Sequence, residues 1–205
     1  MAVKLFEEVN LVEVADYIYS TPFLTPDFAN YIMHKCINLN TWGSEANDPL
    51  YETQDIYFQE ELPEVFAHMM TALKGYVYPE LQELFFTEIP DPYQIFAIKY
   101  AKGLQTNLSL HRDDSFVSGS IKLNNDYEGA ELYFPEQKFS NKETNVGDLI
   151  LWPATITHPH KCEELIKGEK YSVTIWTPYP VIQYDNLTED ELLKRRQSRR
   201  GTKNV

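Results

Sequence analysis

The feature that most constrains the fold is a series of short β-rich segments in the second half of the chain. These segments are rich in β-branched and aromatic residues and are separated by Gly, Asn, Asp and Pro, as strands are. Short strands at this spacing are typical of a β-sandwich or barrel, so we expect such a core over about residues 91–184. The segments cover residues 92–101, 116–123, 130–134, 147–153 and 170–176.

Helical signals dominate the first 90 residues or so. Thr25 and Pro26 form an N-cap followed by proline at the first helical position, and Pro63 opens a second helix in the same way. Pro79 then ends or restarts that helix. We expect these helices, within about residues 1–90, to brace one face of the sheet. Their apolar positions recur at helical spacing: Phe28, Ile32, Cys36 and Ile37 in the first, and Val65, Phe66, Met69, Met70 and Leu73 in the second.

The chain is short enough to form one domain, and we expect a single domain over 1–205. Its end, 187–205, holds six basic residues against three acidic ones, and Thr188 with Glu191 forms a capping box that predicts a C-terminal helix. The rest of the chain is therefore more acidic than the net charge of −13 indicates. The strongly acidic charge of residues 1–186 disfavours nucleic acid as a partner and mildly favours a cationic or neutral substrate.

Composition excludes several classes of protein. With 43% apolar residues the chain can bury a core, and no stretch is long and apolar enough for a membrane span. The first residues carry charges where a signal peptide would be apolar, so we expect a soluble, cytoplasmic protein without membrane partners. Two cysteines, Cys36 and Cys162, are too few for a disulfide framework, and we expect both to be reduced thiols.

Histidine is the most informative residue type, because three of the five lie in the β-rich half. His111 and Asp113 are two residues apart, which places both side chains on one face of an extended segment. A second histidine, His158 or His160, follows the strand predicted at 147–153. Two histidines and one carboxylate form the facial triad that leaves positions open on Fe(II) in oxygenases. The alternative is a His-Asp hydrogen bond in a loop and a surface His-Pro-His.

The segment 170–176 bears on this choice. Lys170, Ser172, Thr174 and Trp176 alternate onto one face. Burying a cation and two hydroxyls costs free energy of desolvation unless an anionic ligand pairs with them. A bound dicarboxylate would be such a ligand. If the segment is instead an edge strand with its polar side in water, no bound anion is needed. Alternation alone does not distinguish these two cases.

Together these blocks resemble the catalytic domain of procollagen lysyl hydroxylases, within the broader prolyl-4-hydroxylase-like Fe(II)/2-oxoglutarate dioxygenases. The resemblance rests on the spacing of Tyr100 from the His111-x-Asp113 pair, the DYEG turn at 126–129, the Thr-His-x-His element at 157–160 and the Gly-x-Lys-Tyr element at 168–171. It extends weakly back to 51–58. The fold it implies is mainly β with α: a double-stranded β-helix, or jelly roll, braced by N-terminal helices.

The resemblance also implies roles for individual residues. His111, Asp113 and a distal histidine would bind iron, Lys170 would pair with the C5 carboxylate of 2-oxoglutarate, and Tyr100 would hydrogen-bond the same cosubstrate. The family's ten-residue spacing from ligand to base selects His160 over His158 as the distal ligand. In two positions the chain departs from lysyl hydroxylases: Lys170 replaces an arginine and loses its bidentate fork, and Ser120 replaces an asparagine.

The implied reaction hydroxylates a lysyl or, less favoured, a prolyl side chain in a peptide or protein, while 2-oxoglutarate is decarboxylated to succinate. Fe(II), 2-oxoglutarate and O2 would be required, with ascorbate as a further candidate. The alternatives are a hydroxylase of a free amino acid or other small molecule, or a jelly-roll binding module without turnover. By analogy we also expect a homodimer, and the absence of a signal segment is consistent with a microbial or viral source.

Overall fold

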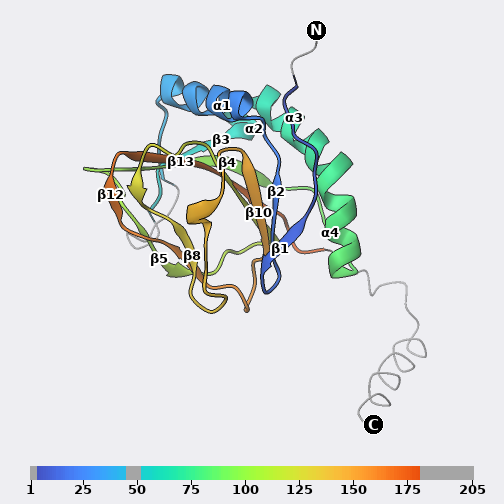
Figure 1. Ribbon diagram of the computed structural model, residues 1–205. Coiled ribbons are helices and arrows are strands. Elements are labelled where there is room, and N and C mark those ends of the chain that lie inside the picture. Colours follow the sequence, from blue (N-terminus) through green and yellow to red (C-terminus); the bar gives the residue numbers. More distant parts are fainter. Residues whose placement is uncertain (1–3, 45–51, 181–205) are drawn as a thin grey trace, which may run out of the picture.

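The structure is a computed structural model that describes residues 4–44 and 52–180 (Figure 1). The helix predicted after Asp185 lies outside these residues. The helices are α1 (Pro26–Leu39), α2 (Phe58–Glu61), α3 (Pro63–Ala72), the π-helix η1 (Leu73–Val77), α4 (Tyr78–Phe85) and the 3-10 turn η2 (Asn141–Glu143). The strands of the first half are β1 (Val12–Ala15), β2 (Ile18–Pro22), β3 (Asp55–Tyr57) and β4 (Gln94–Ala101). Those that follow are β5 (Leu108–His111), β6 (Val117–Lys122), β7 (Glu128–Gly129), β8 (Leu132–Phe134), β9 (Phe139–Ser140), β10 (Asp148–Pro153), β11 (His160–Cys162), β12 (Leu165–Lys167) and β13 (Glu169–Trp176).

The strands form one large antiparallel sheet that faces smaller ones. The large sheet has seven strands in the order β1-β2-β10-β6-β13-β4-β3. A four-stranded sheet, β5-β11-β8-β9, and a two-stranded pair, β12-β7, complete the barrel. Strand β13 is central, because it pairs with β6 along one side and β4 along the other. The edge-strand alternative is therefore excluded, and the polar face of β13 lines the cavity described below.

The helices cover the outer face of the large sheet (Figure 1). Helix α1 begins as predicted: the Thr25 hydroxyl accepts a hydrogen bond from the Phe28 backbone N–H, and Pro26 takes the first helical position. Its fully buried Ile32 belongs to a core shared with α3, α4 and one face of the sheet. The sheet residues in this core include Ile95, Ala97, Ile121, Leu149, Leu151, Val173 and Ile175.

The opposite face of the sheet packs against the smaller sheets in two further clusters. One joins Phe96, Ile98 and Tyr100 of β4 to Cys162 and Leu165. The other joins Ile18, Ile150 and Trp152 of the large sheet to Leu132 and Phe134 of β8. Because alternate residues of one strand serve both cores, the large sheet is buried on both sides, and the inner side carries the cavity described below.

The five predicted β-rich segments are confirmed as β4, β6, β8, β10 and β13. The N-terminal part is less purely helical than expected, because it also supplies β1, β2 and β3 to the large sheet. Strands of three to five residues are too short to show a clear alternation, and their pairing with β10 and β4 provides the stability that their own sequence lacks. None of the helices in the described ranges is long and apolar enough to cross a membrane.

Candidate metal centre and cosubstrate pocket

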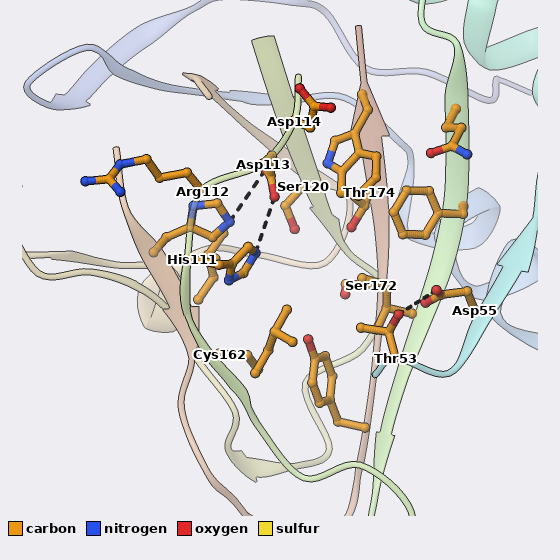
Figure 2. Close-up of a pocket in the computed structure, with 18 of the residues that line it drawn as sticks. Thr53, Asp55, His111, Arg112, Asp113, Asp114, Ser120, Cys162, Ser172 and Thr174 are labelled. Carbon is orange, nitrogen blue, oxygen red and sulfur yellow. Dashed lines mark hydrogen bonds and ion pairs between the residues drawn. The ribbon is translucent and has the colours of Figure 1, made fainter. Parts of the chain in front are cut away.

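Three predicted side chains, His111, Asp113 and His160, meet in one cavity. Figure 2 labels His111 and Asp113 in this cavity. The ligand atoms of the three residues all lie within 4.8 Å of one another. His111 Nε2 lies 3.3 Å from Asp113 Oδ1, and His160 Nε2 lies 3.6 Å from Asp113 Oδ2. The strand register explains the meeting, because His160 of β11 directly faces His111 of β5, and Asp113 follows two residues later.

The tautomers of both histidines suit metal binding. Nδ1 of His111 donates to the Ser109 carbonyl oxygen at 2.8 Å, and Nδ1 of His160 donates to the His158 carbonyl oxygen at 3.1 Å. A proton on Nδ1 leaves the Nε2 lone pair free for a cation, as in metal sites whose histidines are oriented by carbonyls. Both Nε2 atoms point at the Asp113 carboxylate. Two imidazoles and one carboxylate that converge in this way match the ligand set of a divalent iron site with open coordination positions.

The electrostatics of the three groups are coupled. Burial alone would raise the pKa of Asp113, but the charge of His160 and the hydrogen bond from His111 lower it below its ordinary value. Burial lowers the pKa of His160, and the nearby Asp113 only partly opposes this. The hydrogen bond and the charge of Asp113 outweigh burial at His111 and raise its pKa. The carboxylate and the two imidazoles therefore interact electrostatically, and metal binding would require both Nε2 atoms to be free of protons.

His158, the alternative distal ligand, is engaged elsewhere. Its side chain is buried, with Nε2 2.9 Å from the Asp16 carbonyl oxygen and Nδ1 2.8 Å from the Thr157 hydroxyl. Both ring nitrogens are therefore used by the protein, and His158 does not belong to the cluster that could hold a metal. Of the two histidines, the structure brings only His160 to His111 and Asp113.

Lys170 lies at the start of β13, on its inner face. It is 4% exposed, and its Nζ donates to the Ala130 carbonyl oxygen at 2.9 Å. The ammonium also lies 3.6 Å from Cys162 Sγ and 5.0 Å from the centre of the Tyr100 ring. Burial raises the pKa of Tyr100, which keeps this phenol protonated as a hydrogen-bond donor. In the part of the chain that the structure describes, no carboxylate forms an ion pair with Lys170.

A single cavity of about 740 Å³ contains both the three-residue cluster and Lys170. The inner face of β13 contributes Ser172, Thr174 and Trp176 to its wall. In Figure 2 the labelled Ser172 and Thr174 lie across the cavity from His111. The cavity therefore has metal-binding groups at one place and a buried cation with hydroxyls at another, which suits a small dicarboxylate anion.

Sequence reasoning missed part of this wall. Trp152 and Trp176 pack in the core and also line the cavity. Asp55 and Thr53, which lie on or beside the short strand β3, line it too, although no motif marked them. Cys162 is a free thiol, as predicted, and it is buried on β11.

Comparison with known proteins gives consistent results. No family model matches the chain. It is 25% identical over 179 residues to "Procollagen lysyl hydroxylase and glycosyltransferase" of Acanthamoeba polyphaga mimivirus, covering 81% of this chain and 20% of that protein. It is 24% identical over 183 residues to "Multifunctional procollagen lysine hydroxylase and glycosyltransferase" of Caenorhabditis elegans, covering 82% of this chain and 25% of that protein. The chain thus spans a quarter or less of the length of these relatives.

Solved structures show the same fold. A prolyl-4-hydroxylase of Pseudomonas putida superimposes with a TM-score of 0.65 at 16% identity, covering 80% of this chain and 93% of that one. The viral collagen prolyl hydroxylase of Paramecium bursaria Chlorella virus-1 superimposes with a TM-score of 0.57 at 15% identity, covering 80% and 97%. The predicted jelly roll is confirmed. By its sequence relatives and its fold, the chain matches the prolyl-4-hydroxylase-like 2-oxoglutarate and iron-dependent oxygenases.

Proposed function

We propose that this protein is an Fe(II)- and 2-oxoglutarate-dependent hydroxylase of a lysyl or prolyl side chain in a peptide or protein. The observation that carries the proposal is the shared cavity, in which His111, Asp113 and His160 converge and Lys170 is buried without a carboxylate partner among the described residues. Iron with 2-oxoglutarate and O2 would supply the oxidising chemistry, in which succinate and CO2 are released and the substrate gains a hydroxyl group.

The chain's own residues would hold and orient the reactants. His111, Asp113 and His160 would bind the metal through Nε2, a carboxylate oxygen and Nε2. Lys170 has three ammonium protons and donates to the Ala130 carbonyl oxygen and to Cys162 Sγ, which leaves one for the distal carboxylate of the cosubstrate. Tyr100, next to the ammonium, would donate its hydroxyl to the same carboxylate. The apolar and aromatic wall would exclude water from the reacting centre.

A peptide substrate is supported by the relatives, whose names describe lysine hydroxylases acting on procollagen. The cavity rim of this chain adds Asp114, a carboxylate at the mouth beside the metal-binding cluster (Figure 2). A carboxylate there favours a cationic side chain, so we rank lysyl above prolyl substrates. The net charge of −13 acts in the same direction by attracting basic peptides.

The first test is succinate formation from 2-oxoglutarate by the purified protein with Fe(II), ascorbate and O2. Slow turnover without peptide that His160→Ala removes, and that the exposed control His68→Ala retains, is the expected result. Turnover that survives His160→Ala contradicts the proposed ligand set. Paired lysine and proline peptides, analysed by mass spectrometry for the gain of one oxygen atom, then identify the substrate. If neither kind of peptide gains oxygen while succinate forms, a free amino acid or another small molecule is the substrate.

A further inference from the structure

Three residues of the large sheet form a row directly behind the metal-binding cluster. Ser118 of β6 faces Trp152 of β10 on one side and Trp176 of β13 on the other. All three point to the inner face of the sheet, where both tryptophans line the cavity. We call Trp152, Ser118 and Trp176 the donor row, because an indole can only donate a hydrogen bond and a serine hydroxyl can donate one and accept others.

The donor row is unusual because its polar atoms are buried without hydrogen bonds. Ser118 is 0% exposed and Trp152 is 2% exposed. The Ser118 hydroxyl and both indole N–H groups have no hydrogen-bond partner among the described residues. Buried polar groups are normally paired, since an unpaired one costs free energy. Three unpaired groups on adjacent strands therefore point to an acceptor that is brought into position when the pocket is filled.

The acceptor that the protein itself offers is Asp113. Its carboxylate is buried and lies between the Nε2 atoms of His111 and His160. Trp152, the neighbour of Ser118 in the donor row, packs edge-on against His160 with ring centres 5.1 Å apart, and His160 lies 3.6 Å from Asp113. The Ser118 hydroxyl also lowers the pKa of Asp113. The indoles on either side of Ser118 cannot accept its proton, so within this wall the carboxylate is its natural target.

We propose that Ser118, held between the two indoles of the donor row, is a positioning residue that orients the Asp113 carboxylate for metal binding. When a metal draws one carboxylate oxygen toward itself, the other oxygen can accept the Ser118 proton in a charge-assisted hydrogen bond. The indoles shield this bond from water. The inference rests on the proposed function, because it takes Asp113 to be a metal ligand.

The test compares Ser118→Ala with Ser120→Ala. Ser120 is the next residue on the same face of β6 and lines the cavity, and it pairs with Ile150 and Thr174 rather than with the two tryptophans, so its variant removes a hydroxyl that lies outside the donor row. Mn(II) is the probe, and its affinity is measured by calorimetric titration of the purified protein. Co(II) absorption, which reports coordination geometry, and the melting temperature of the metal-free protein are measured on the same variants.

We expect Ser118→Ala to weaken Mn(II) binding on the order of 10-fold and to change the Co(II) spectrum, while Ser120→Ala does neither. The metal-free melting temperature of Ser118→Ala should stay unchanged or rise, because the variant removes a buried hydroxyl that lacks a partner. A lower melting temperature would show a structural role and overturn the inference.

Unchanged Mn(II) affinity in Ser118→Ala would also overturn the inference. If Asp113→Ala abolishes binding in that case, only the role of Ser118 fails and the ligand set stands. If the wild-type protein binds no Mn(II), the proposed function fails, and the inference fails with it.

Discussion

The buried ammonium of Lys170 allows a prediction in which folding and cosubstrate binding respond in opposite directions. The change is Lys170→Met, which keeps the length and apolar stem of the side chain and removes the charge. In the free protein Lys170 donates hydrogen bonds to the Ala130 carbonyl oxygen and to Cys162 Sγ, and it lies over the Tyr100 ring. A hydrogen bond to a charged group contributes about 1.5–3 kcal/mol and a cation–π contact about 0.5–2 kcal/mol.

Against these contributions stands the desolvation of an ammonium that is 4% exposed, which costs several kcal/mol. The balance predicts that Lys170→Met leaves the free energy of unfolding within about 1 kcal/mol of wild type, or raises it. In a protein of this size 1 kcal/mol corresponds to about 2–4 °C in melting temperature. We therefore expect the metal-free variant to melt no lower than about 4 °C below wild type.

The cosubstrate should respond far more strongly. A dicarboxylate in the cavity would lose its buried cationic partner, which costs about 2–5 kcal/mol. At about 1.4 kcal/mol per factor of ten, the Kd for 2-oxoglutarate should rise by about 30-fold to 4,000-fold. Titration of Mn(II)-loaded protein with 2-oxoglutarate measures this, and Lys167→Met, which changes an exposed lysine on β12, is the matched control.

Two results would refute this reasoning. A Kd for 2-oxoglutarate that Lys170→Met leaves unchanged would move the carboxylate site elsewhere in the cavity. A large loss of stability in the metal-free variant would mean that the ammonium is a structural element, and that its hydrogen bond to Ala130 outweighs its desolvation.

Three further predictions test the ligands, the thiols and the turns. Asp113→Ala should abolish succinate formation with little change in melting temperature, because the carboxylate pairs with the two metal-binding histidines and belongs to none of the apolar cores; retained turnover would contradict its role. Burial raises the pKa of Cys36 to about 12, so its thiol should not react with a disulfide reagent at pH 8 until the protein is denatured; rapid labelling of the folded protein would contradict its placement in the core. Gly129→Ala should destabilise by more than about 2 kcal/mol in denaturant titration, since φ is +82° and a Cβ would lie 2.1 Å from the Glu164 carbonyl oxygen. Gly103→Ala, with φ of +84° and open space around it, should lower the free energy of unfolding clearly less. Equal losses in the two variants would show that backbone strain alone, and not the clash with Glu164, sets the effect.

Much of the fold could be predicted because the long elements carry their own signals. Helix α1 begins at the predicted cap, and β4, β10 and β13 are long enough to alternate clearly. Strands such as β5 and β11 were missed, because three or four residues are too few to show a clear alternation of apolar and polar side chains. Their positions depend on pairing with segments distant in the sequence, and no local signal reports that pairing.

The same limit applies to the site. The His111-x-Asp113 spacing identified two members, but alternation alone left His158 and His160 open. The ten-residue spacing of the resembled family selected His160, and the register of β11 brings that residue opposite His111. The alternation along β13 grouped Lys170, Ser172 and Thr174, yet it did not tell which side of the sheet is inner; the packing of the helices on the opposite face decides that. The donor row is the extreme case, because its three members come from three different strands and share no sequence motif.

The choice between His158 and His160 shows how register decides chemistry. Two histidines two residues apart point the same way only if both lie in one extended strand. Strand β11 begins at His160, so His158 precedes it, and the alternation rule does not apply across that boundary. His158 instead bonds to Asp16 and Thr157 through both nitrogens, and its own carbonyl oxygen accepts the Nδ1 proton of His160. The first histidine of the pair therefore fixes the tautomer of the second, which leaves the Nε2 lone pair of His160 directed at the place where a metal would bind.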